Sequence, residues 1–172
     1  MIYKNLLITQ ANEVAELLYQ YINSRDNLHK SSGTFRSLLK SIDYSTIYNE
    51  IDSVKANFEN KERELIEFKD EYYGSLADVS MEFFDTLELY FQALYEAVKQ
   101  LHLLVFRLYE TSKGIVNNDR KLSWSEYSQL TKTCYEKHKE YLKFGDKLNQ
   151  AYKILENEQN DFINDETVLS IH

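Results

Sequence analysis

The segment 76–112 constrains the fold of this chain more than any other part of the sequence. Its apolar residues recur at steps of three and four, the spacing of one face of an α-helix, and they form two separate stripes. A helix that is apolar around most of its circumference has to be enclosed by other helices. We therefore predict that this segment is the unbroken central helix of a bundle, about 55 Å long. The first stripe comprises Leu76, Val79, Phe83, Leu87, Tyr90, Leu94, Ala97, Leu101, Leu104 and Leu108. The second comprises Phe84, Phe91, Tyr95, Val98, His102, Val105 and Tyr109, with Phe106 beside it.

The rest of the sequence is also helical in its spacing. The chain of 172 residues has no proline and only four glycines, which favours helices over strands and long loops. Apolar periodicity predicts further helices over residues 2–23, 46–73 and 124–164. Residues 24–33 are small and polar and predict a break, and Thr34 is a candidate N-cap of a short helix. That short helix would bury Phe35, Leu38, Leu39 and Ile42.

Residues 46–73 repeat apolar positions at strictly alternating steps of four and three, the seam of a helix that packs along another. Lys61 interrupts this row, and we expect its stem to pack at the bundle edge while its ammonium reaches water. The row comprises Ile47, Ile51, Val54, Phe58, Lys61, Leu65, Phe68 and Tyr72.

Candidate capping residues stand near the predicted helix ends. Asp43 or Ser45 is expected to cap the helix over 46–73, Gly74 to end it, and Ser75 to cap the central helix. Gly114 is expected to close the central helix. Residues 123–126 read Ser-Trp-Ser-Glu, which is a capping box at the start of the last helix.

The predicted helix lengths define the fold class. The central and last helices are long enough to pair along their full extent, whereas the other two cover only part of that pair. We predict an all-α, elongated, up-and-down antiparallel bundle of four main helices plus one short helix, with coiled-coil-like packing. Residues 1–164 would form a single domain, and residues 165–172 a flexible C-terminal tail.

Charge and composition limit the classes of partner that we expect for this chain. The chain has 28 acidic and 20 basic residues, a formal charge of −8, which argues against nucleic acid or an anionic membrane as the main partner. The longest uncharged apolar stretch, residues 100–106, is far shorter than the ~18 residues that span a bilayer. No signal peptide is recognised, and the single Cys134 excludes an intramolecular disulfide, so we expect a cytoplasmic protein.

The acidic residues are concentrated in one part of the chain. Residues 47–112 carry 14 acidic and six basic side chains, a net −8, and the remainder of the chain is neutral. This excess is either a solvated surface or a surface for a basic partner. The candidate acidic surface comprises Glu59, Glu62, Glu67, Asp70, Glu71, Asp78 and Glu82.

The sequence offers little catalytic chemistry. Cys134 and His138 share one helical face, but both fall on the inward stripe, where packing explains them as well as zinc binding does. Bundles with a di-iron centre carry a glutamate three residues before a histidine, and here those positions hold Asp26, Lys99 and Tyr135. We therefore expect a non-enzymatic protein with no catalytic, metal or cofactor site, although a bundle enzyme without a recognisable motif stays open.

Two functions follow as hypotheses. The preferred one is a helical protein–protein interaction module, a homodimer in which the second stripe of the central helix is covered by another subunit. The alternative is an acidic inhibitor, or an immunity or anti-defence protein, that covers a basic site on a partner enzyme or nucleic-acid-binding complex. The candidate interface of the first hypothesis comprises Phe84, Phe91, Tyr95, His102, Phe106 and Tyr109.

Overall fold

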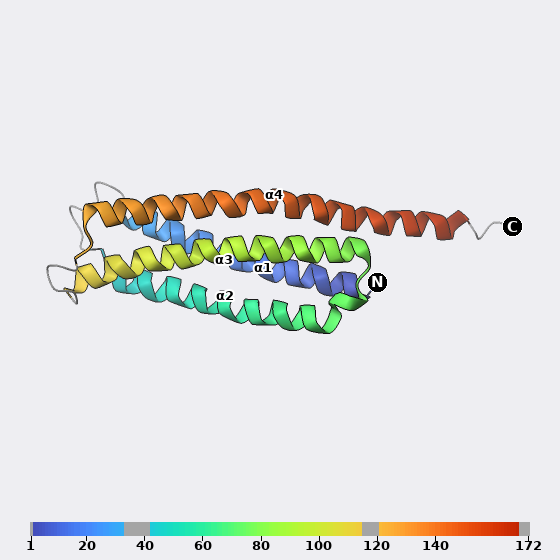
Figure 1. Cartoon of the computed structure of the whole chain (residues 1–172), viewed down its shortest axis with the longest axis horizontal. Helices are drawn as coiled ribbons and strands as arrows, with labels where there is room; N and C mark the ends of the chain where they lie inside the picture. Colours follow the sequence, from blue (N-terminus) through green and yellow to red (C-terminus); the bar gives the residue numbers. More distant parts are fainter. Residues whose placement is uncertain (1, 33–41, 115–120, 169–172) are drawn as a thin grey trace.

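The computed structural model of the chain describes residues 2–32, 42–114 and 121–168. They form the helices α1 (Ile2–Ser32), α2 (Tyr44–Tyr72), α3 (Asp78–Lys113) and α4 (Trp124–Val168), with a short 3₁₀ turn, η1 (Tyr73–Ser75), between α2 and α3. The described residues contain no strand. The four helices lie along one axis and alternate in direction, so that both chain ends lie at the same end of the bundle (Figure 1). The prediction of an all-α, up-and-down antiparallel bundle is confirmed.

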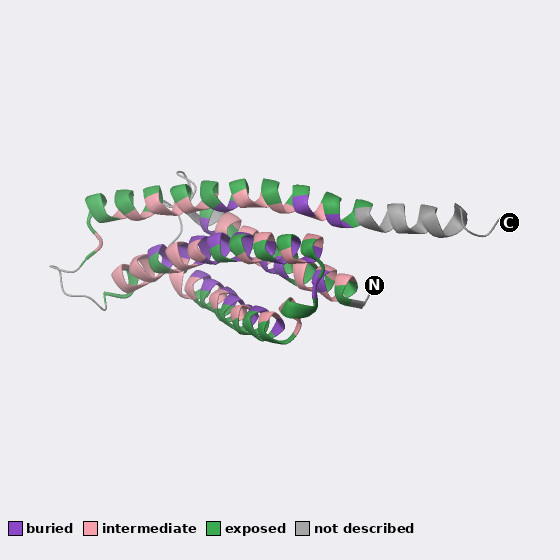
Figure 2. Cartoon of the chain, turned by 45° about the vertical axis from the view of Figure 1, so that its right-hand side comes forward, coloured by how far each residue is buried: buried purple, intermediate pink, exposed green. Residues whose placement is uncertain are grey.

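Helix α3 is the centre of this bundle, as its two apolar stripes predict. It packs against α4, α2 and α1, and buried residues run along it (Figure 2). The first stripe faces α4, where Tyr90 meets Tyr141 with 6.3 Å between ring centroids. The second stripe faces α2, where Phe91 stacks on Phe58 at 5.7 Å. The segment is a single helix, and it is enclosed by three other helices of its own chain.

Close packing of α4 on α3 depends on a glycine. A Cβ atom at Gly145 would lie 3.3 Å from Cε2 of the buried Tyr90 ring. Glycine at this position therefore lets the two helix backbones approach across the ring.

The apolar row of α2 is confirmed residue by residue, except for the environment of Lys61. The buried residues of α2 include every member of that row up to Phe68. Lys61 itself is only 4% exposed, and its ammonium donates to Gln10 and Glu13 of α1 and to Glu64. The expectation that the ammonium reaches water is wrong, because two carboxylates and an amide from the surface fold over it.

Helix α1 is longer than predicted. The break expected at residues 24–33 is absent up to Ser32, and Leu28 is buried in the core. Ser24 is buried too, since its hydroxyl donates to Glu50 of α2 at 3.0 Å, and the amide of Asn27 donates to the same carboxylate at 3.1 Å. Ser24 therefore continues the packed face, whereas Asn27 makes its contact with Glu50 at the exposed surface. Of the predicted short helix, only Ile42 lies within the described residues, and it packs against the core.

The helix ends agree with the predicted caps in part. Asp43 caps α2 by accepting from the Ser45 backbone N–H at 3.1 Å and from the Thr46 hydroxyl. Gly114 ends α3 with a left-handed φ of 64°, a conformation that favours glycine. Ser75 is not the cap of α3, because it lies in η1 and the helix starts at Asp78 after the extended residue Ala77.

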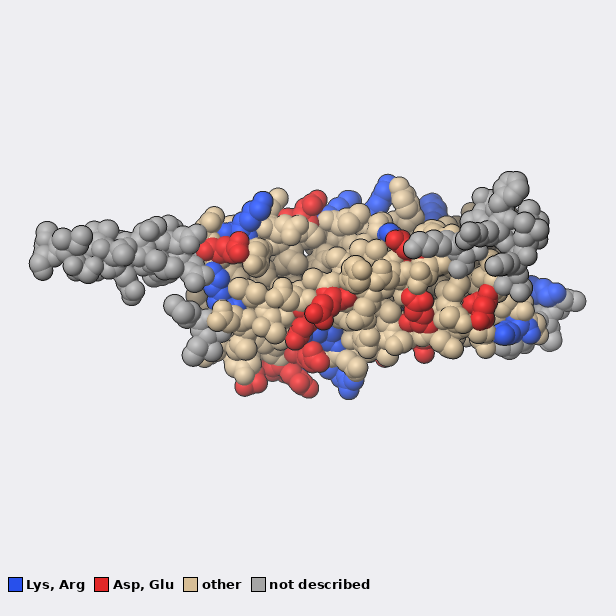
Figure 3. Space-filling view, turned by 180° about the vertical axis from the view of Figure 1, so that it is seen from behind, with Lys and Arg blue, Asp and Glu red and all other residues tan. Residues whose placement is uncertain are grey.

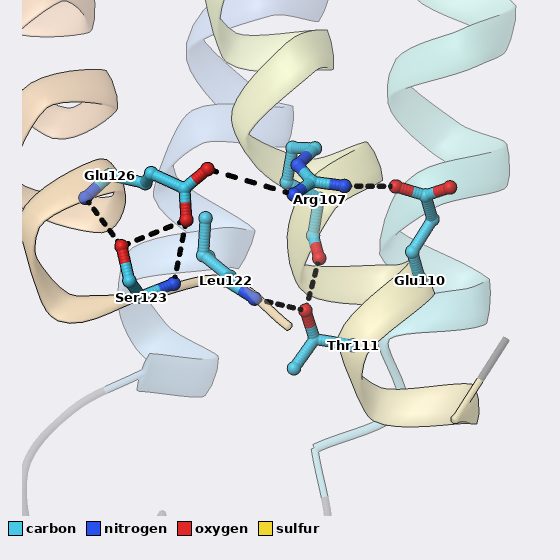
Figure 4. A network of polar contacts seen from close by, with 6 residues as sticks. All are labelled: Arg107, Glu110, Thr111, Leu122, Ser123 and Glu126. Atoms are coloured by element: carbon cyan, nitrogen blue, oxygen red, sulfur yellow. Dashed lines mark hydrogen bonds and ion pairs between the residues drawn. The ribbon is translucent and has the colours of Figure 1, made fainter. Parts of the chain in front are cut away.

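The capping box at the start of α4 is confirmed, and α3 holds it in place (Figure 4). The Glu126 carboxylate accepts from the backbone N–H and the hydroxyl of Ser123, and the Glu126 N–H donates to the Ser123 hydroxyl. Arg107 of α3 lies 3.9 Å from this carboxylate. The Leu122 N–H donates to the Thr111 hydroxyl at 3.2 Å. These contacts fix the direction of the start of α4 relative to the end of α3.

Helix α4 also continues beyond the predicted boundary at residue 164, because it is helical up to Val168. It extends past the other helices at its C-terminal end (Figure 1). The predicted tail therefore begins four residues too early, and its remaining residues, 169–172, lie outside the described part of the chain.

Candidate functional site

Half of the candidate interface lies inside the bundle. Phe84 and Phe91 are fully buried and Tyr95 is 3% exposed. Phe68 of α2 stacks on Phe84 at 5.2 Å, and Phe58 stacks on Phe91 and Tyr95. The inference that these residues need another subunit is corrected, because α2 covers them within one chain.

The other half of the candidate interface is only partly buried, and it packs against a single tyrosine. Tyr48 of α2 lies 5.5 Å from the His102 ring, 5.6 Å from the Phe106 ring and 5.1 Å from the Tyr109 ring, on which it stacks. The Nε2 atom of His102 lies 2.9 Å from Asp52 Oδ1. His102 is thus a packing residue with one carboxylate contact at the surface.

Six of the seven members of the candidate acidic surface are exposed, and Glu62 is half-buried. Glu59 forms an ion pair with Lys55, whose hydrogen bond lowers the pKa of the Glu59 carboxyl. Glu62 accepts from the amide of Gln92 at 3.2 Å. The remaining members are exposed, and in the described part of the chain none forms an ion pair with a lysine or arginine. These are Glu67, Asp70, Glu71, Asp78 and Glu82.

Two exposed apolar residues stand on this acidic side. Ile66 of α2 is 51% exposed and Leu89 of α3 is 55% exposed. Two cross-helix contacts bracket them: Lys69 pairs with Glu88 at 2.6 Å, and Gln92 donates to Glu62. Ile66 and Leu89 therefore lie at the same level of the α2–α3 surface. Both lie off the buried stripes, which is the one sequence signal that marks them as outward-facing.

The opposite side of the bundle has a different surface. Helix α1 lies behind α3 in Figure 1, and so toward the viewer in Figure 3, where acidic and basic side chains are scattered among uncharged areas. Tyr19 of α1 is 67% exposed, and Tyr135 and Leu142 of α4 are 59% and 49% exposed. The rings of Tyr21 in α1 and Tyr141 in α4 contact each other, with 5.9 Å between their centroids.

A cavity of about 330 Å³ lies between α1, α3 and α4. Its polar wall contains Arg25, whose Nη1 lies 3.0 and 3.1 Å from the two ring nitrogens of His138. Burial, and secondarily the charge of Arg25, lowers the pKa of His138. Cys134 also lines the cavity, and burial raises the pKa of its thiol to about 11. The sequence did not reveal this cavity, because the segment that carries Arg25 was interpreted as a break in the helix.

Within the described ranges, no group of three or more histidine, cysteine, aspartate or glutamate side chains is placed to hold a metal ion. Among the same residues, none of the helices combines the length and apolarity needed to cross a bilayer.

Comparison with known proteins adds no family to these observations. No protein-family model matches the chain, and neither a curated protein nor a solved structure is significantly similar to it. The function proposed below therefore rests on the surfaces and the cavity of this chain.

Proposed function

We propose that this chain is a non-enzymatic helical interaction protein whose α2–α3 face binds a basic partner. The observation that carries the proposal is the exposed pair Ile66 and Leu89 on the most acidic side of the molecule. Protein interfaces commonly have an apolar centre within a polar rim. The partner we infer therefore presents lysine or arginine around an apolar contact.

The distribution of charge supports this proposal. The residues of α2, η1 and α3 between 47 and 112 account for the whole net charge of −8. A surface of one sign speeds association with a partner of the opposite sign and disfavours like-charged competitors. An inhibitor that covers a basic enzyme site is one protein of this kind.

The proposal is tested by co-purification from lysate of the organism that encodes the chain, with the wild type and two variants as bait. One variant, Ile66→Ala with Leu89→Ala, removes the apolar centre. The other, Glu67→Gln with Asp70→Asn and Glu82→Gln, removes three exposed charges. We expect a basic protein that binds the wild type at low salt, is released at high salt, and binds each variant about tenfold more weakly.

Matched controls lie on the other helices. Tyr19→Ala with Leu142→Ala removes an equally exposed apolar pair from α1 and α4. Glu136→Gln with Glu140→Gln and Asp146→Asn removes three exposed charges from α4. Both controls should keep the partner. The proposed surface is contradicted if both test variants still capture the partner, or if the control variants lose it instead.

Self-association remains a second candidate, on a different surface from the one that the sequence suggested. The observation in its favour is the exposure of Tyr19 on α1 and of Tyr135 and Leu142 on α4. Two copies of a chain with net charge −8 repel least when they meet away from residues 47–112, which account for that charge. Exposed tyrosines are also common anchors at protein interfaces.

Sedimentation velocity at micromolar concentration tests this second candidate. We expect a dimer for the wild type and a monomer for Tyr19→Lys with Leu142→Lys, because two added charges would have to be buried at the contact. Ile66→Lys, on the acidic side, is the matched control and should leave the dimer intact. A wild-type chain that sediments as a monomer removes this candidate without affecting the proposal for the α2–α3 face.

A further inference from the structure

We infer that the cavity between α1, α3 and α4 is a binding site for a small carboxylic acid with an apolar body, and that Arg25 receives its carboxylate. The inference rests on three features of the cavity. These are the guanidinium of Arg25 at the lining, a set of neutral polar neighbours, and apolar lining residues.

The guanidinium of Arg25 is held in place but is not saturated. Its Nη2 donates to Asp26 at 3.1 Å and its Nη1 contacts His138. Its Nε is buried and has no hydrogen-bond partner. Because Nε is closed off from the solvent, a ligand carboxylate has to accept from the two terminal nitrogens. Each of these carries a second N–H group besides the one used in the contacts with Asp26 and His138.

Asp26 does not replace that ligand. Its side chain is 46% exposed, and ion pairs in contact with water contribute little binding energy. Asp26 therefore orients the guanidinium and leaves the second N–H group of each terminal nitrogen for another carboxylate. Arginine binds carboxylates well because its planar donors match their two oxygens.

Three polar side chains that line the cavity with Arg25 are neutral at physiological pH. Burial and the nearby arginine lower the pKa of His138, so its imidazole is uncharged and can accept from Nη1. Burial raises the pKa of the Cys134 thiol to about 11. Burial likewise raises the pKa of the Tyr21 hydroxyl, although Arg25 opposes that rise. None of these three groups adds a negative charge that would repel an anion.

The remaining wall selects for an apolar body. Leu28, Leu101 and Leu104 also line the cavity. Its volume of about 330 Å³ lies at the lower end of the range of about 300–1,000 Å³ that small-molecule pockets have. One guanidinium beside three leucines fits a monocarboxylate with a small ring or short chain, whereas a polyphosphate would require several cations.

Phenylacetate and its neutral analogue phenylacetamide are the probes for this site. Binding to the wild-type chain is measured by calorimetry and by shifts of the backbone amide signals of residues 131–138. We expect phenylacetate to bind about tenfold more tightly than phenylacetamide and to shift those signals. This comparison needs no variant, so it stands even if substitution of Arg25 disturbs folding. Equal affinity for the two probes, or no shift at residues 131–138, overturns the inference.

A pair of variants assigns the carboxylate to Arg25. Arg25→Met keeps much of the stem and removes the donors, and it should weaken phenylacetate binding about tenfold. Arg63→Met removes an exposed arginine of α2, and it should leave binding unchanged. Equal binding by Arg25→Met and the wild type contradicts the assignment.

Cys134 provides an independent readout of occupancy, because its side chain lines the cavity. Saturating phenylacetate should slow alkylation of the thiol by N-ethylmaleimide several-fold, whereas phenylacetamide at the same concentration should not. An alkylation rate that phenylacetate leaves unchanged places the ligand elsewhere and overturns the inference.

Discussion

Replacing Phe91 with alanine is expected to lower the free energy of unfolding by about 3–5 kcal/mol. Phe91 is fully buried and lies between two aromatic rings, with centroids 5.7 Å away at Phe58 and 6.0 Å away at Tyr95. The truncation removes buried apolar area and both ring contacts, and it leaves a cavity that a helix pair cannot easily close. Denaturant unfolding followed by circular dichroism measures the change.

Leu89 provides the control for this substitution, because it stands two residues earlier on the same helix and is 55% exposed. Leu89→Ala should change the free energy of unfolding by less than about 0.5 kcal/mol. The loss in Phe91→Ala should also be independent of protein concentration, since α2 of the same chain covers the residue. A loss that shrinks as concentration rises would show that a second subunit covers this stripe after all.

Removing both carboxylates from Lys61, with Glu13→Ala and Glu64→Ala, is expected to lower the free energy of unfolding by about 2–3 kcal/mol. The ammonium is buried in a side chain that is only 4% exposed, and it would retain Gln10 as its acceptor. The two carboxylates themselves are 46% and 57% exposed, so their own hydration changes little. The loss in the free energy of unfolding therefore comes from the buried Lys61 ammonium, which no longer has a carboxylate beside it.

Lys61→Met tests this explanation from the other side. It removes the charge and keeps the apolar stem, so it should change stability by no more than about 1 kcal/mol. Added to the double variant, it should restore most of the lost stability. Glu16→Ala with Glu67→Ala, two exposed acids of the same helices, is the matched control. No rescue by Lys61→Met would mean that the carboxylates act through something other than the ammonium.

The fold could be predicted from the sequence wherever the signal is local. The row from Ile47 to Phe68 follows the helix period, and all of its members are buried. The capping box at Ser123 depends on two residues three positions apart, and its hydrogen bonds are those predicted. Both signals lie within a few turns of one helix, where spacing alone determines geometry.

The errors concern residues whose partners are distant in the sequence. In the sequence, Ser24 resembles the start of a loop, but in the structure its hydroxyl donates to Glu50 of another helix. In the sequence, Lys61 resembles a residue at the bundle edge, but in the structure its ammonium donates to Glu13 of α1. A polar side chain in an apolar row is ambiguous in sequence, because the tertiary partner decides whether it ends the row or joins it.

The same limit applies to the candidate sites. The second stripe of α3 shows that the helix must be enclosed, but it does not say whether another helix or another subunit encloses it. Six of the seven acidic residues are exposed, as charge alone predicts, and Glu62 is half-buried. The cavity at Arg25 was missed because its other polar wall, His138, lies 113 positions away in the chain.

The alternating helix directions have a practical consequence for all of these experiments. Because the number of long helices is even, the two chain ends lie at one pole of the bundle (Figure 1). Arg25, late in α1, and His138, early in α4, lie toward the other pole. A biotin tag or affinity handle on either end would thus hold the molecule upright on a sensor, with the cavity directed away from the support.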